Sequence, residues 1–266
     1  MFSCCLSWFS ISLVIILFLS TNCAVKPPFY GAKEISISND RILLEKKDQI
    51  KKFEGRIREG LQRGFLPIID VEFHYGQGIE IDKLIERMDE NGVALTWLAP
   101  GGDLGRSGVS LALNALYPDR IVPTTVSGDG ELWHSNDKGF LDILAIVVRS
   151  GRYFAMGEFE ARHYHAGPST SPDAHTRVDS EAMRVVFELS KEKNIPFLLH
   201  HEAEDKLLPE LELMLSRYPE AKVIWCHVGR NRDPNTWKKF RKAEAVREFM
   251  QKYPNLYKLC QKTPGF

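Results

Sequence analysis

The sequence predicts an α/β protein of the (β/α)8 TIM-barrel type that is incomplete, with about six to seven β/α units present. Three observations support this prediction. Six short apolar runs alternate with amphipathic helical stretches, several runs end in carboxylates or imidazoles, and 266 residues with 44% hydrophobic content suffice for one large core. In a parallel barrel the carboxyl ends of all strands meet at one rim. We therefore expect a functional site at that rim.

The apolar runs are expected to form strands, and the amphipathic stretches the helices between them. The strand candidates are 66–73, 93–98, 121–126, 153–159, 195–199 and 222–226. The helical stretches lie near residues 80–91, 107–118, 137–149, 179–193, 206–217 and 238–252. Near-continuous apolar strands that alternate with helices indicate parallel pairing with right-handed crossovers. A doubly wound open sheet is the alternative, but such a sheet binds its ligand at one switch point, whereas polar residues here follow many strands.

The chain ahead of the first strand divides into a leader, an arm and a helix. Residues 1–22 contain no charged side chain, and their apolar core is short for a transmembrane span, so they predict a signal peptide or membrane-targeting segment. The residues up to Cys23 loosely resemble a bacterial lipobox, which predicts a lipid-anchored lipoprotein as an alternative to a free periplasmic protein. An uncleaved membrane anchor is the third interpretation. Residues 23–64 form the arm and the helix, whose pattern over 39–63 ends at Gly64.

The barrel domain is expected to span 65–266 and to be truncated. Residues 255–260 can serve as a seventh strand, but the sequence stops at Phe266 before any eighth strand. A barrel left open exposes two unpaired strand edges. A separate chain that supplies the remaining units is one alternative interpretation.

Composition predicts a protein that acts on small molecules. Lys plus Arg and Asp plus Glu both total 35, so nothing suggests a nucleic-acid surface, and membrane contact is expected only through the leader. After the leader only Cys226 and Cys260 remain, which is too few for a disulfide framework. Because Cys226 ends an apolar run, we interpret it as a small buried residue rather than a nucleophile.

The strongest local motif follows the first strand. Residues two apart in a strand point the same way, so Glu72 and His74 are expected to converge on one side while Phe73 packs on the other. A carboxylate oxygen and an imidazole nitrogen are suitable ligands for zinc or manganese. The alternative is a pair at the rim that hydrogen-bonds to loops.

Two histidines occupy equivalent places in later units. His200 and His227 each end an apolar run, and in a closed barrel both would approach the residues of the first strand. We therefore predict both as metal ligands. His201 is an alternative to His200, with the other histidine free to orient it.

The fourth strand candidate ends in two carboxylates of the same parity. Glu158 and Glu160 are predicted as catalytic residues, with one of them bridging two metal ions or serving as acid and base, and Glu158 is the preferred ligand. The alternative is a salt bridge to Arg162. His163 and His165 precede a turn-forming segment and are interpreted as solvated loop histidines, with substrate contact as the alternative.

These residues resemble those of the amidohydrolase superfamily, in particular its amidohydrolase-related branch of metal-dependent hydrolases and non-oxidative decarboxylases. The resemblance covers about residues 65–260. In that family the first strand offers His-x-His or, in some decarboxylase-like members, Glu-x-His; the fourth offers a carboxylated lysine or a glutamate; the fifth and sixth each offer a histidine. The matching residues here are Glu72, His74, Glu158, His200 and His227.

The resemblance implies a divalent metal, zinc by preference with manganese as the alternative. It implies hydrolysis of a small amide, ester or lactone by metal-activated water, or else non-oxidative decarboxylation. The family's usual general base, an aspartate after strand eight, has no counterpart in the sequence as given. A catalytically impaired barrel with a binding role or no function is therefore the non-enzymatic alternative.

Overall fold

The computed structural model describes residues 39–76, 78–101, 104–128, 130–163, 175–227, 238–239 and 242–258. The predicted leader 1–22, the arm as far as residue 38, Cys23, His165 and Cys260 lie outside these residues. Among the described residues, no helix combines the length and the apolar character that crossing a membrane requires.

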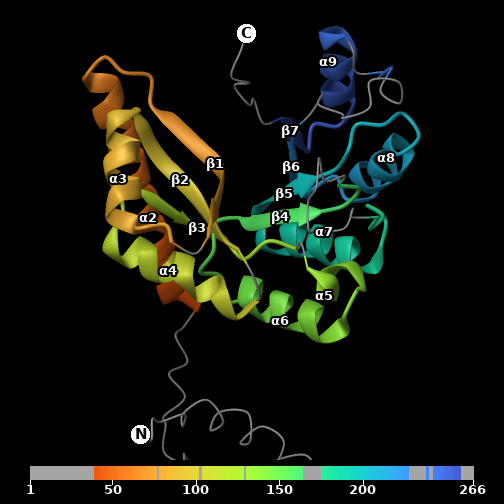
Figure 1. Ribbon diagram of the computed structural model, residues 1–266, viewed down its shortest axis with the longest axis horizontal. Coiled ribbons are helices and arrows are strands. Elements are labelled where there is room, and N and C mark those ends of the chain that lie inside the picture. The colour runs from red at the N-terminus through yellow and green to blue at the C-terminus, as the bar shows by residue number, and fades with distance from the viewer. Residues whose placement is uncertain are drawn as a thin grey trace, which may run out of the picture. The chain divides into compact units, whose positions relative to one another are not determined.

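Strands and helices alternate along the described chain (Figure 1). The strands are β1 Ile68–Tyr75, β2 Val93–Pro100, β3 Ile121–Pro123, β4 Met156–Glu160, β5 Pro196–His200, β6 Lys222–Cys226 and β7 Leu256–Lys258. The helices are α2 Asn39–Gln62, α3 Ile81–Glu90, α4 Ser107–Leu116, α5 Glu131–His134, α6 Lys138–Arg149, α7 Glu181–Lys193, α8 Leu208–Arg217 and α9 Ala243–Lys252, with a short 3-10 helix, η1 Leu104–Arg106, ahead of α4. The predicted elements are found with boundaries shifted by a few residues, and α5 and η1 are additional.

The strands follow one another in space in the order of the sequence. One sheet has the order β1-β2-β3 and the other β4-β5-β6-β7, and all pairs are parallel. Two parallel bridges, Thr124 with Ala155 and Gly128 with Phe159, join the segment after β3 to β4. A doubly wound sheet would reverse its strand order at a switch point. Among the described residues, the sequential parallel order of seven strands therefore confirms the α/β class and the barrel-type arrangement.

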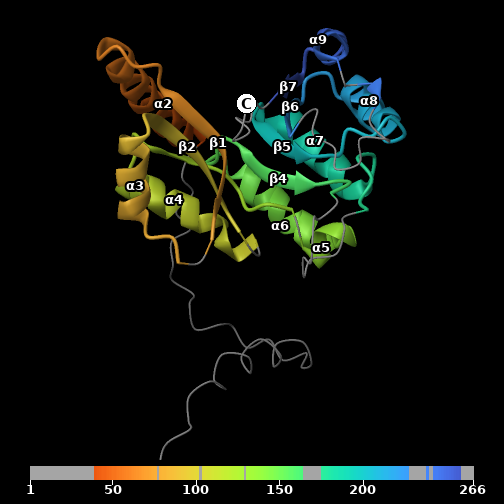
Figure 2. The same ribbon diagram turned by 45° about the horizontal axis from the view of Figure 1, so that its top comes forward.

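The two faces of the strands have different roles. Phe159 is fully buried and packs on the ring of Trp133 with centroids 4.9 Å apart, on the side covered by α5, α6 and α7. Figure 2 shows α6 and α7 beside β4 and β5. We call the opposite side of the strands the inner face. Because side chains alternate along a strand, Glu158 and Glu160 project from β4 onto this inner face.

Helix α2 belongs to the same compact unit as the sheets. Its Phe53 is buried against Ala94, Leu95 and Val122, so burial of apolar surface holds the helix on β2 and β3. The helix ends where Gly64 adopts a φ of +78°, a left-handed conformation that glycine takes without steric cost. The predicted stop at Gly64 is therefore confirmed.

Candidate metal centre

A buried carboxylate surrounded by imidazoles lies at the carboxyl ends of the strands. Oε1 of Glu158 is 3.0 Å from Nδ1 of His200 and 3.5 Å from Nε2 of His227. Its Oε2 is 3.0 Å from Nε2 of His74. In the described part of the chain, the ion-pair partners of Glu158 are these three histidines. Side chains from β1, β4, β5 and the end of β6 thus meet at one carboxylate.

The first strand supplies a second carboxylate to the same place. Oε1 of Glu72 lies 2.9 Å from Nε2 of His227, while His74, two residues further on, reaches Glu158. Phe73 between them packs with the apolar cluster of Leu98 on the helix side. The structure therefore bears out the predicted convergence of Glu72 and His74.

Strand register places side chains of β4, β5 and β6 on the same face. Glu160 is the register partner of His200, and His200 is the register partner of Cys226. Paired residues of neighbouring parallel strands point to the same face, so these three side chains share the inner face with Glu158. The ring of His200 also has Nε2 at 3.9 Å from Oε1 of Glu202, a second carboxylate that can orient it.

The backbone at His227 explains how this residue joins the site. Alternation along β6 places Trp225 on the helix side and Cys226 on the inner face, so the next residue would turn back towards the helices. His227 instead has a φ of +57°, a left-handed conformation that costs free energy in a residue other than glycine. The turn lets two consecutive side chains, Cys226 and His227, face the same centre.

Electrostatics at the centre favour an ionised carboxylate among imidazoles. Burial raises the pKa of Glu158, but hydrogen bonds from His200, His227 and His74 outweigh burial and hold that pKa well below its ordinary value. Burial lowers the pKa of His200, while its hydrogen bonds to Glu158 and Glu202 raise it by more. The pair therefore favours the charged forms of both groups.

The donor atoms are close enough together to hold a divalent ion. One ligand atom each from Glu158, His200 and His227 lie within 4.8 Å of one another, and the same holds for Glu72, Glu158 and Cys226. A tetrahedral zinc ion separates its ligand atoms by roughly 3–4 Å, so small side-chain adjustments suffice. Carboxylate, imidazole and thiol donors suit zinc, and the carboxylates and imidazoles also suit manganese. The residues present thus fit the predicted metal.

The structure selects between the two adjacent histidines after β5. His200 faces Glu158, whereas His201 is 3% exposed and its ring lies 6.3 Å from that of Trp225, between centroids. Burial lowers the pKa of His201 to about 4, so this side chain is neutral at physiological pH. The predicted alternative of His201 as the residue beside Glu158 is therefore not supported.

A second cluster of polar side chains adjoins the centre. Oε1 of Glu160 is 2.7 Å from Nδ1 of His163, and its Oε2 is 3.7 Å from Nε2 of His134. Nδ1 of His134 lies 2.7 Å from the hydroxyl of Thr176. The ring of His163 packs on that of His200 with centroids 3.6 Å apart. The two clusters are thus in direct contact.

The interpretation of His163 as a solvated loop histidine is wrong. Its side chain is only 13% exposed because it packs between Glu160 and His200. The predicted alternative for the carboxylates, a salt bridge to Arg162, does not match the structure either: Arg162 pairs with Glu210 at 2.7 Å. Both interpretations relied on the local sequence, which does not show which distant residues lie nearby in the folded chain.

The acid sensitivity of the metal-free protein is expected to depend on Glu160. Burial raises its pKa, but hydrogen bonds to His134 and His163 outweigh burial and lower it from 4.5 to about 2. A lowered folded-state pKa contributes stability that is present above 4.5 and lost as the pH falls towards 2. Unfolding free energies from urea titrations between about pH 5 and pH 3 should therefore fall less steeply in Glu160→Gln than in the unmodified chain. Equal slopes would show that Glu160 is not held ionised by its histidines.

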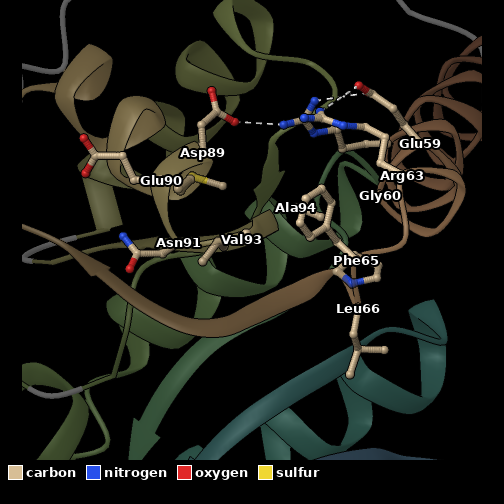
Figure 3. A pocket seen from close by; sticks show the side chains of 14 residues that line it. Glu59, Gly60, Arg63, Phe65, Leu66, Asp89, Glu90, Asn91, Val93 and Ala94 are labelled. Atoms are coloured by element: carbon tan, nitrogen blue, oxygen red, sulfur yellow. Dashed lines mark hydrogen bonds and ion pairs between the residues drawn. The ribbon is translucent and has the colours of Figure 1, made fainter.

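A hollow at the opposite end of the strands lacks comparable chemistry. It has a volume of about 680 Å³ and is lined at the start of β2 by Val93. Four of its charged groups form ion pairs, Arg63 with Glu59 at 3.6 Å, two residues labelled in Figure 3, and Arg56 with Asp89 at 2.8 Å. In barrels the amino-terminal end of the strands serves stability rather than catalysis. The candidate site is therefore the centre around Glu158.

Comparisons with known proteins give matches among solved structures alone. No protein-family model and no curated protein matches the sequence. A 2,6-dihydroxybenzoate decarboxylase is 12% identical over 60% of this chain and 66% of its own, with a TM-score of 0.42. Dihydroorotase from Campylobacter jejuni is 15% identical over 74% of this chain and 54% of its own, with a TM-score of 0.45.

A third match is a dihydroxybenzoic acid decarboxylase from Polaromonas sp. JS666, solved with bound manganese and the inhibitor 2-nitroresorcinol. It is 15% identical over 72% of this chain and 77% of its own, with a TM-score of 0.42. These matches are amidohydrolase-superfamily proteins, the family that the residues resemble. Since all three TM-scores lie under 0.5, the functional argument rests on the residues of this chain.

Proposed function

We propose that this chain is a metal-dependent hydrolase of the amidohydrolase type, acting on a small-molecule amide, ester or lactone. The supporting observation is the buried carboxylate of Glu158, which contacts three imidazoles, from β1, from β5 and from the turn after β6. Burying these polar groups costs free energy that apolar side chains would not cost, so we expect the arrangement to serve a function. That function is ligation of a divalent cation, zinc by preference.

The residues would divide the work in the following way. Glu72, His74, Glu158, His200 and His227 would hold the cation. A bound divalent ion lowers the pKa of a water molecule towards about 7 and polarises a carbonyl group. Glu160 contacts Nδ1 of His163 and would orient its ring beside that of His200, and this pair would serve as acid and base.

Non-oxidative decarboxylation is the second candidate, because the first strand carries Glu72 and His74 in a Glu-x-His arrangement. In that reaction the same centre would hold the substrate's carboxylate and an adjacent hydroxyl. We also propose that residues 1–22 direct export, with or without a lipid anchor at Cys23. Export favours hydrolysis of an extracytoplasmic substrate over decarboxylation. A non-catalytic binding role is the outcome if metal binds and no substrate turns over.

The test is a metal-dependent activity assay on the full chain. Protein loaded with Zn²⁺ or Mn²⁺ would be offered an aryl ester, a lactone, a cyclic amide and a hydroxybenzoate. We expect turnover of one of the first three, and a loss in His227→Ala greater than the roughly 10- to 100-fold typical of residues that only orient ligands.

Glu220 supplies the control variant Glu220→Gln, because this carboxylate lies in the turn before β6 and its side chain is 61% exposed. Release of carbon dioxide from the hydroxybenzoate, with no hydrolysis, would replace the first candidate with the second. Turnover that survives His227→Ala would contradict both.

A further inference from the structure

The thiol of Cys226 lies within the group of candidate ligands. Its Sγ, one oxygen of Glu72 and one oxygen of Glu158 all lie within 4.8 Å of one another. Cys226 is fully buried and is not part of a disulfide. As the register partner of His200, it projects from β6 onto the inner face, the face that carries the centre.

We propose that Cys226 is a thiolate ligand of the divalent cation and makes the centre selective for zinc over manganese. This inference rests on the proposed function, because it concerns the same centre. Cys226 would add a sulfur donor to the carboxylate and imidazole ligands, and manganese and magnesium bind sulfur poorly.

The position of Cys226 differs from that of a cysteine that only fills space. A structural cysteine packs among apolar side chains, and the apolar cluster on the helix side of β6 contains its neighbour Trp225. Cys226 instead faces the carboxylates of Glu72 and Glu158. Its thiol contacts the carbonyl oxygen of Ile224 at 3.8 Å and also interacts with the carboxylate of Glu158. The sulfur therefore lies beside two anionic groups that a cation would neutralise.

Ligation requires the thiol of Cys226 to lose its proton, because the thiolate and not the thiol is the form that binds a metal. When a divalent ion binds, the S–H bond breaks, the proton leaves to solvent, and the sulfur's electron pair forms the bond to the metal. The metal is neither oxidised nor reduced.

Cobalt spectroscopy on the full chain tests this assignment directly. Co²⁺ occupies zinc sites and shows an intense near-ultraviolet charge-transfer band when a thiolate is a ligand. We expect this band in the unmodified protein and its loss in both Cys226→Ser and Cys226→Ala, with Co²⁺ still bound through the remaining ligands. A control chain with Cys4→Ser, Cys5→Ser, Cys23→Ser and Cys260→Ser, which keeps Cys226 alone, should retain the band.

Metal competition provides the second measurement. Replacing Cys226 with serine should reduce the preference for Zn²⁺ over Mn²⁺ by at least about tenfold, because a hydroxyl does not share the thiolate's softness. Bound Co²⁺ without the band in the unmodified protein would overturn the role of Cys226 and leave the proposed function standing. Retention of the band in Cys226→Ser would also overturn it. Absence of any Co²⁺ binding would overturn both proposals, so the two failures are distinguishable even if the Cys226 variants do not fold.

Discussion

Replacing Glu158 with glutamine is expected to abolish stabilisation of the protein by divalent metal. The imidazoles of His74, His200 and His227 all approach this carboxylate, and glutamine of the same shape offers a neutral, weak ligand. A ligand that binds only the folded state stabilises it by about 2.7 kcal/mol at a concentration of 100 times its Kd. Thermal melts with and without Zn²⁺ should show this increment in the unmodified chain and not in Glu158→Gln.

An exposed glutamate provides the control for that experiment. Glu220 lies in the turn before β6 with its side chain 61% exposed, and its contact with Lys191 is 4.0 Å long. Glu220→Gln should therefore keep the full metal increment and the full stability of the unmodified protein. A metal increment that persists in Glu158→Gln, or disappears in Glu220→Gln, would contradict the assignment of Glu158 as the central ligand.

The second large effect is expected at Gly157, which precedes Glu158 on β4. A Cβ atom added there would lie 2.7 Å from the backbone carbonyl oxygens of both Thr125 and Val126. Backbone atoms cannot move aside as a flexible side chain does, so β4 and the segment after β3 would have to separate. Gly157→Ala should lower the free energy of unfolding by about 3 kcal/mol, measured by urea titration.

A second glycine-to-alanine change should have the opposite sign. Gly55 lies inside α2, and a Cβ added there would meet nothing within 4 Å. Gly55→Ala should therefore stabilise the protein by about 0.5–1 kcal/mol, because alanine loses less backbone entropy in a helix. Equal effects of the two substitutions on the free energy of unfolding would show that Gly157 does not pack closely against the backbone of Thr125 and Val126.

The strands and part of the site could be predicted because their signals are local. Apolar runs of strand length mark β1 to β6, and most residues of β2 to β6 are buried. The two-residue period of a strand places Glu72 and His74 on one side. His200 and His227 each follow an apolar run, so parallel topology alone brings both to the same end of the sheet.

The remaining site residues depend on contacts that the sequence does not encode locally. Without the left-handed backbone at His227, the side chains of Cys226 and His227 would point to opposite faces. The sequence contains no residue type that predicts such a turn. His163 precedes a segment rich in turn-forming residues, so the local pattern predicted a solvated loop. Nothing in that pattern indicated its packing on His200.

Helix α5 shows the same limit in the fold. Its four residues, Glu131–His134, are too few to show the helical period. What fixes this turn is tertiary: Trp133 is fully buried, and its indole N–H donates to the backbone carbonyl of Glu160 at 2.9 Å. The same turn carries His134 to the carboxylate of Glu160, so a functional contact depends on an element that periodicity cannot reveal.

The most direct test of the metal centre is the metal content of the purified full chain after dialysis against Zn²⁺, measured by elemental analysis beside a Glu72→Ala/His74→Ala double variant. These two side chains contact His227 and Glu158, so the double change opens the centre from the β1 side. We predict at least stoichiometric zinc in the unmodified protein and a loss of most of it in the double variant. A folded, cooperatively melting protein that retains no zinc, or a double variant that retains as much as the unmodified chain, would contradict a metal centre at these residues.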